Sequence, residues 1–183
     1  MKNRRKECLI NPSEEEILDR EPLIAFSFYL SGQNNQLLLI SEEIIENLNK
    51  GFSTTSIRGD FIGRASTLMW LWTLGAYEVV RTMCQARVCF SNDFYLKISE
   101  LKRKLAKVRM PNAKMEKQGK KLPVNSNRSP DGWDVLKKDL LIGDPDTPIS
   151  GRILLEEYEA IMSSLTINDV LKHHTESYTD KKK

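Results

Sequence analysis

A line of polar side chains runs through the most hydrophobic stretch of the chain and is the first candidate for chemistry. Arg64, Glu78 and Arg81, with Thr67 and Gln85, recur at helical spacing on the side opposite to an apolar stripe. In a polar cleft, Arg81 would bind an anion and Glu78 would act as a base. Arg64, Glu78 and Arg81 therefore form a candidate polar site for an enzyme that acts on a phosphorylated or otherwise anionic substrate.

The spacing of Glu78 and Arg81 also supports a structural role, which the sequence favours. Residues three apart in a helix are neighbours, so the two side chains can pair with each other. Because buried charges are normally paired, such an ion pair would fix helix packing. No histidine or set of metal ligands lies nearby to complete a catalytic centre. We expect the two side chains to be in contact and well removed from water.

Basic residues concentrate between Lys97 and Lys138, where thirteen Lys and Arg face four Asp and Glu and the net charge is +9. Because the whole chain carries +3, the remainder carries −6. This polarity is typical of a site for an anionic partner, such as RNA, DNA or an acidic protein. A solvated surface balanced by acidic residues elsewhere is an equally simple interpretation. The candidate anion-binding residues are Arg109, Lys114, Lys117, Lys120, Lys121 and Arg128.

Other residues that could carry chemistry form weaker patterns. His173 and His174 are adjacent, so on a helix they point to different sides, and we expect them to be solvated. Asp93 with the run Glu-Leu-Lys at 100–102 has the residue order of a metal-dependent nuclease site. Such a site normally needs a strand, and these residues fall in a predicted helix. Trp133 could stack on a base, but a tryptophan in a loop more often anchors that loop to the core.

Familiar catalytic motifs are missing from the sequence. It contains no GxxxxGK[ST] phosphate loop, no GxGxxG fingerprint, no GxSxG elbow and no metal-type Cys/His spacing, so we expect neither a metal nor a cofactor. The three cysteines form no CxxC pair and the N-terminus lacks a signal-peptide pattern, which predicts a cytoplasmic location. The apolar stretch at 61–80 is interrupted by Arg64 and Glu78, so we expect no membrane span.

The elements that must position these residues are mainly helical. An apolar stripe with steps of three and four residues predicts a core-facing helix within 60–90, and a second stripe predicts a helix from Ser91 to 109. The short connection between them should make the two helices antiparallel. A third helix is predicted at 150–165. We expect Trp72 and Met69 to be buried, facing the apolar stripe of the second helix.

Two segments are harder to assign. Residues 22–40 alternate as a β-hairpin would, with SGQNN as its loop, yet Pro22 and Gly32 would equally bracket a short helix. The aromatic content slightly favours the hairpin. A separate short helix is expected at 41–51. Residues 110–148 have little periodicity and many polar residues, which predicts a long basic loop.

The predicted architecture is a mainly α, compact helical bundle with a possible short N-terminal β-hairpin and a long basic loop. Residues 1–21 are predicted to be a mobile polar arm, 22–177 a single helical domain with 110–148 as an insertion, and 178–183 a tail. Two classes of function remain. The first is a non-enzymatic binding protein that engages an anionic partner through residues 97–138, and the second is an enzyme. We prefer the first, because it requires only a basic surface and no complete set of catalytic residues.

Overall fold

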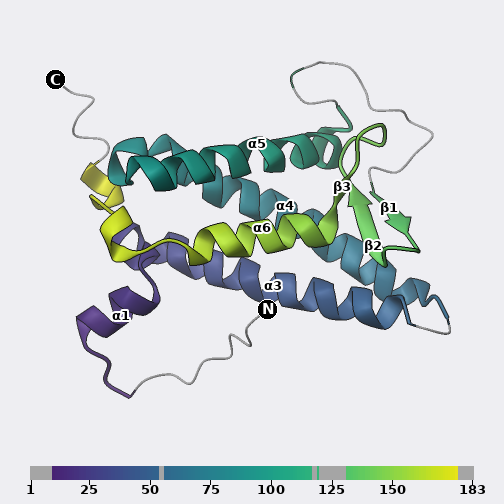
Figure 1. Cartoon of the computed structure of the whole chain (residues 1–183), viewed down its shortest axis with the longest axis horizontal. Coiled ribbons are helices and arrows are strands. Elements are labelled where there is room, and N and C mark those ends of the chain that lie inside the picture. Colours follow the sequence, from purple (N-terminus) through teal and green to yellow (C-terminus); the bar gives the residue numbers. More distant parts are fainter. Residues whose placement is uncertain (1–9, 54–55, 117–118, 120–130, 177–183) are drawn as a thin grey trace.

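A bundle of antiparallel helices forms the body of the molecule (Figure 1). The computed structural model of the chain describes residues 10–53, 56–116, 119 and 131–176. Within these ranges the long helices are α3 (Phe28–Gly51), α4 (Gly59–Gln85), α5 (Asn92–Lys114) and α6 (Gly151–Ser163). Each runs in the direction opposite to the one before it. The prediction of a mainly α helical bundle is therefore confirmed.

Shorter elements close the two ends of the bundle. The helices α1 (Glu14–Arg20) and α2 (Leu23–Phe26) lie at one end, together with the 3-10 turns η1 (Arg87–Cys89) and η2 (Ile167–Asp169). At the other end the described chain forms an antiparallel sheet of order β1-β2-β3, with strands β1 (Asp131–Asp134), β2 (Asp139–Ile142) and β3 (Ile149–Ser150). Parts of the predicted arm and of the predicted basic loop are therefore regular structure.

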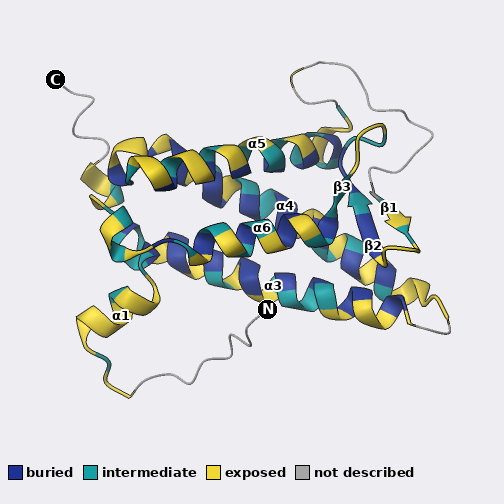
Figure 2. Cartoon of the chain, viewed as in Figure 1, coloured by how far each residue is buried: buried dark blue, intermediate teal, exposed yellow. Residues whose placement is uncertain are grey.

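Helix α4 supplies the centre of the core, and its predicted register is confirmed. All seven positions of its apolar stripe are buried, namely Ile62, Ala65, Met69, Trp72, Ala76, Val79 and Met83. The indole Nε1–H of Trp72 donates a hydrogen bond of 3.1 Å to the carbonyl oxygen of Leu37 in α3. Its ring packs edge-on against Tyr158 of α6, with centroids 5.2 Å apart. Trp72 thus joins three helices, and the buried positions face inward along the bundle (Figure 2).

Helix α5 begins where the sequence predicts but continues further. The hydroxyl of Ser91 accepts a hydrogen bond from the backbone N–H of Phe94 and caps the first turn. The helix passes through Pro111 and ends at Lys114. Proline has no backbone N–H, so at position 111 only the hydrogen bond to the carbonyl of Lys107 is missing. The last turn of the helix is closed by Met115, which adopts φ +55° and donates its N–H to the carbonyl of Pro111.

The predicted hairpin at 22–40 is wrong, because these residues belong to α2 and α3. Ser27 caps α3, its hydroxyl accepting from the N–H of Leu30. The SGQNN run lies inside the helix, where the Ser31 hydroxyl donates to the Glu21 carboxylate and Asn34 accepts from the hydroxyl of Tyr158. These contacts outweigh the low helix propensity of Gly, Ser and Asn. The short helix expected from residue 41 is the second half of α3.

The last described turn is tied to the start of α5 through the carboxylate of Asp169. The Ser91 hydroxyl donates to it at 2.6 Å, and the hydroxyl and N–H of Thr166 donate at 2.8 and 3.1 Å. Burial opposes ionisation and raises the pKa of Asp169. The hydrogen bonds from Ser91 and Thr166 outweigh this effect and hold that pKa below its ordinary value. The ionised carboxylate of Asp169 therefore stabilises the fold at any pH above the pKa that this group has in the unfolded chain. That stabilisation is lost as the pH falls to the lower pKa of the folded state.

We therefore expect Asp169→Asn to be less stable than the wild type at pH 7 by about 1 kcal/mol, the usual cost of losing a capping residue. The difference should shrink as the pH falls below the ordinary aspartate pKa of about 4, because the unfolded wild-type chain then takes up a proton more readily than the folded carboxylate does. Urea unfolding at pH 7, 5 and 3 measures the free energies of unfolding. A difference that stays constant from pH 7 to 3 would contradict the role of the ionised carboxylate.

Candidate functional site

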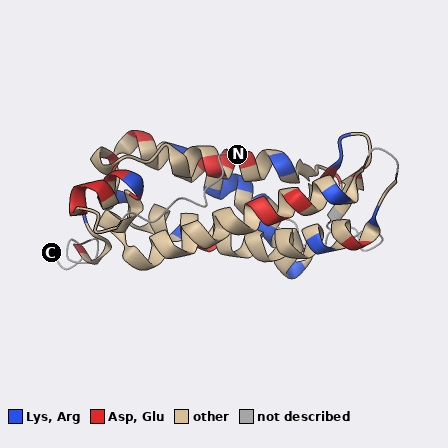
Figure 3. Ribbon diagram, turned by 90° about the horizontal axis from the view of Figure 1, so that it is seen from below, with Lys and Arg blue, Asp and Glu red and all other residues tan. Residues whose placement is uncertain are grey.

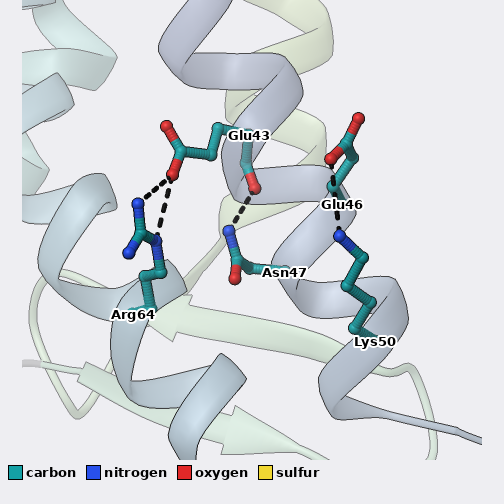
Figure 4. Close-up of polar contacts among 5 residues, drawn as sticks. All are labelled: Glu43, Glu46, Asn47, Lys50 and Arg64. Carbon is teal, nitrogen blue, oxygen red and sulfur yellow. Dashed lines mark hydrogen bonds and ion pairs between the residues drawn. The ribbon is translucent and has the colours of Figure 1, made fainter.

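The structure does not bring the predicted polar site together. Arg64 reaches from α4 to α3, where its Nε and Nη2 atoms lie 3.0 and 2.5 Å from Oε1 of Glu43 (Figure 4). Fourteen residues of continuous helix separate Arg64 from Glu78, which is about 21 Å at 1.5 Å per residue. Arg64 is therefore part of an interhelical ion pair and cannot act on the same small substrate as Glu78.

Glu78 and Arg81 contact each other as predicted, but they are not removed from water. Arg81 Nε donates to Glu78 Oε2 at 2.7 Å, and Arg81 Nη2 lies 2.6 Å from the same oxygen. The side chain of Glu78 is 48% exposed and that of Arg81 is 41% exposed. The prediction that they are buried is wrong, because the face of α4 that carries Glu78 and Arg81 points away from the core of the bundle. The carboxylate already holds a cation and is open to water.

A row of basic side chains lies on the outward side of α5. Arg103, Lys107 and Lys114 are spaced four and seven residues apart, which places them on one helical face, opposite to the buried stripe. We call these three residues the α5 basic face. All three are exposed. Along the helix axis they are separated by about 6 Å and about 10 Å.

The α5 basic face is only partly neutralised. Arg103 lies 3.7 Å from Glu100 in the preceding turn. Within the described part of the chain, Lys107 and Lys114 make no ion pair. Helix α5 as a whole holds seven Lys and Arg against two acids, Asp93 and Glu100. The positive potential of α5 is therefore directed outward, where a ligand can approach it.

Other basic residues of α5 are engaged with neighbouring helices. Lys104 pairs with Glu157 of α6 at 2.8 Å. The guanidinium of Arg109, a candidate anion-binding residue, lies over the ring of Tyr77 in α4, 4.9 Å from its centroid. This cation–π contact and its partial burial make Arg109 a packing residue as much as a ligand-binding one. Of the other candidates, Lys114 is on the α5 basic face, whereas Lys117, Lys120, Lys121 and Arg128 lie outside the described residues.

Two polar features lie close to Lys114. The indole Nε1–H of Trp70 in α4 donates at 3.1 Å to the carbonyl oxygen of Asn112, which holds the end of α5 against the bundle. The carboxamide of Asn112 is buried, and neither of its polar atoms has a hydrogen-bond partner among the described residues. Trp133 lies on β1 and is 52% exposed, so its ring does not anchor the segment in the core as the sequence suggests.

His173 lies outside any helix and His174 begins a 3-10 turn, and the predicted divergence of their side chains is wrong. Their rings pack against each other with centroids 4.2 Å apart. Nδ1 of His174 lies 3.0 Å from the carbonyl oxygen of Phe26, and this side chain is half-buried. Among the described residues, no three His, Cys, Asp or Glu side chains gather as a metal ion would require. None of the described helices has the length and apolar composition needed to cross a bilayer.

Arg103 and Lys107 are not among the anion-binding residues predicted from the sequence, although both fall within the basic segment 97–138. Their spacing of four residues could have indicated them, because it places both side chains on one face of the predicted helix, away from its apolar stripe. The chain matches no family model, no curated protein and no solved structure. A functional proposal must therefore come from the residues of this chain alone.

Proposed function

We propose that this chain is a non-enzymatic nucleic-acid-binding protein that holds phosphate groups on the α5 basic face. The observation that carries the proposal is the row of Arg103, Lys107 and Lys114 along one exposed face. Two of the three cations have no anionic partner within the described chain. A phosphate backbone would supply those partners and release its bound counterions on binding.

The character of the face favours a nucleic acid over an acidic protein. Between Glu100 and Lys114, a stretch that the structure describes throughout, no large apolar side chain is exposed. Stable protein interfaces usually have an apolar core within a polar rim, whereas the exposed large apolar side chains here, Leu96 and Met115, lie only beyond the two ends of this stretch. Spaced cations without such a core are suited to a repeating row of phosphates, with backbone contacts and little base specificity.

An enzyme built on Arg64, Glu78 and Arg81 has less support. Each of these side chains is already held in a short ion pair, and the arginine at 64 is about 21 Å along the helix from Glu78. Nothing in the described part of the chain favours a reaction at these three residues. The proposal therefore rests on binding.

Changing Arg103, Lys107 and Lys114 together to Gln should weaken binding to a 20-nucleotide RNA or DNA by about tenfold or more at 100 mM salt. Each phosphate contact contributes about 0.7–0.9 to the slope of log K against log salt, so the slope should flatten by about two to three units. Fluorescence anisotropy between 50 and 300 mM NaCl measures both quantities. The thermal midpoint should change little, because the three side chains are on the surface.

A variant with Arg20, Lys50 and Arg58 changed to Gln is the matched control, since it loses the same charge at exposed positions away from α5. It should retain most of the affinity and the salt slope. Changing Lys117, Lys120 and Lys121 to Gln tests the remaining part of the candidate set in the same assay. Equal losses in the α5 variant and the control, or no binding at 50 mM salt, would refute the proposal. Retention of the chain by an immobilised acidic protein instead would identify the alternative partner.

A further inference from the structure

A small polar pocket lies at the end of the bundle opposite to the sheet. It is lined by the corner between α1 and α2, by one turn of α3 and by the last turn of α6, and its volume is about 190 Å³. The end of α5 that carries Lys114 lies at the other end of the molecule (Figure 1). The pocket is therefore separate from the α5 basic face, and an inference about it is independent of the proposed function.

Asn34 places an oriented hydrogen-bond donor in the wall of this pocket. The residue is only 8% exposed. Its Oδ1 accepts a hydrogen bond of 3.0 Å from the hydroxyl of Tyr158, which is completely buried. Burial raises the pKa of Tyr158, so this hydroxyl remains a donor at neutral pH. With Oδ1 occupied, the amide Nδ2 of Asn34 is the group left to bind a ligand, and it makes no hydrogen bond within the described chain.

Glu21 places a charged acceptor in the same pocket. Its Oε2 atom accepts from the hydroxyl of Ser31 at 3.1 Å and from Nδ2 of Asn35 at 2.9 Å. These two bonds fix the carboxylate, and its Oε1 atom has no hydrogen bond among the described residues. Asp19 and Arg20 line the same pocket and add one charge of each sign. Helix α1 has three acidic residues in its first turn, so acidic residues predominate on this helix (Figure 3).

The wall also contains Pro22 and Ser163, with a few apolar side chains beside them. Leu23, Met162 and Leu165 line the pocket, and each is at least nine-tenths buried. The volume is below the range of about 300–1,000 Å³ that is usual for drug-sized ligands. The pocket thus combines an anionic acceptor, a neutral donor, a nearby guanidinium and a short apolar wall in a space suited to a small metabolite.

We propose that this pocket binds a free α-amino acid with an aliphatic side chain. The ammonium group donates to Oε1 of Glu21, which satisfies the carboxylate and matches the acidic surroundings. The carboxylate accepts from Nδ2 of Asn34, with Arg20 supplying positive charge. The aliphatic side chain packs against Leu23, Met162 and Leu165. Binding is non-covalent, and the hydrogen bonds that already orient Asn34 and Glu21 reduce the ordering that the ligand must impose.

The test is calorimetric titration and thermal unfolding of the full chain with L-leucine, L-valine and L-methionine. Binding should raise Tm by about 5 °C at a hundredfold excess over the dissociation constant. Isoamylamine and 4-methylpentanoate, which each retain only one of leucine's two charged groups, should bind at least about tenfold more weakly, because each loses one charge-assisted hydrogen bond to the pocket. If none of the three amino acids gives heat or a Tm shift at 10 mM, the proposal is overturned.

Variants locate the site. Glu21→Gln should weaken leucine binding by about tenfold or more, whereas Glu15→Gln, an exposed change of the same charge on α1 outside the pocket, should not. Asn34→Asp keeps an acceptor for Tyr158 but replaces the donor with a negative oxygen. It should abolish leucine binding and spare isoamylamine. Leucine binding that survives both pocket variants would place the ligand elsewhere and overturn the proposal. Neither result alters the expectation for nucleic acid.

Discussion

Trp72→Ala should lower the free energy of unfolding by about 3–5 kcal/mol, the usual cost of a large-to-small change in a core. The side chain is completely buried, and its indole N–H satisfies the carbonyl oxygen of Leu37. Its ring also packs against Tyr158, so the truncation removes contacts with both α3 and α6. Urea unfolding followed by circular dichroism measures the change.

Trp70→Ala is the matched control, because Trp70 lies on the same helix and is half-exposed. Its truncation removes one hydrogen bond, to the carbonyl of Asn112, and should cost at most about half as much. If Trp72→Ala does not fold, Trp72→Phe retains most of the apolar volume and should still be clearly destabilised. Equal losses at positions 70 and 72 would contradict the central position assigned to Trp72.

Asp139→Ala should cost about 3 kcal/mol, because it removes a buried carboxylate that holds the sheet to α6. Oδ1 of Asp139 accepts from the N–H groups of Leu140 and Arg152 at 2.7 and 3.1 Å, and Oδ2 accepts from the hydroxyl of Ser150. Alanine leaves these donors unsatisfied beside the first turn of α6, where each lost bond to a charged group costs about 1.5–3 kcal/mol before relaxation. Thermal and urea unfolding give the size of the loss.

Asp93→Ala serves as the comparison, since Asp93 is also in the first turn of a helix but is exposed. It should lose less than about 1 kcal/mol, the value of a favourable charge near a helix N-terminus. Asp139→Asn retains an acceptor and should fall between the two. A loss at position 139 no larger than that at position 93 would mean that the buried network contributes little.

The parts of the fold that were predictable follow from local periodicity. The stripes of α4 and α5 repeat without interruption, and a buried helical face is the simplest structure that explains them. Helix α3 was missed because Ser31, Gly32, Asn34 and Asn35 look like a turn. Ser31 and Asn35 are held in the helix by hydrogen bonds to Glu21, ten and fourteen residues away, and Asn34 by a bond from Tyr158 in α6. Three of the residues that hid the helix, Ser31, Asn34 and Asn35, also line the pocket.

In the candidate sites, too, features set by local spacing were predictable and features set by distant contacts were not. Contact between Glu78 and Arg81 depends only on helical spacing and was predicted correctly, whereas their exposure depends on which neighbours pack beside them. The partner of Arg64 is Glu43, twenty-one residues away, and no local pattern indicates it. The row on α5 required knowing that the helix continues through Pro111 to Lys114. The sequence could locate the basic segment, but only the structure defines its outward face.

The order of the helices has a consequence for how the chain folds. Helix α4 makes its most extensive contacts with α3 and α5, its neighbours in sequence, whereas α6 approaches the other helices less closely. Contacts between neighbours close short loops and form early, so α3, α4 and α5 can assemble first. Docking of α6 then brings Tyr158 against Trp72 from eighty-six residues away. Interactions of α6 should accordingly affect the unfolding rate more than the folding rate.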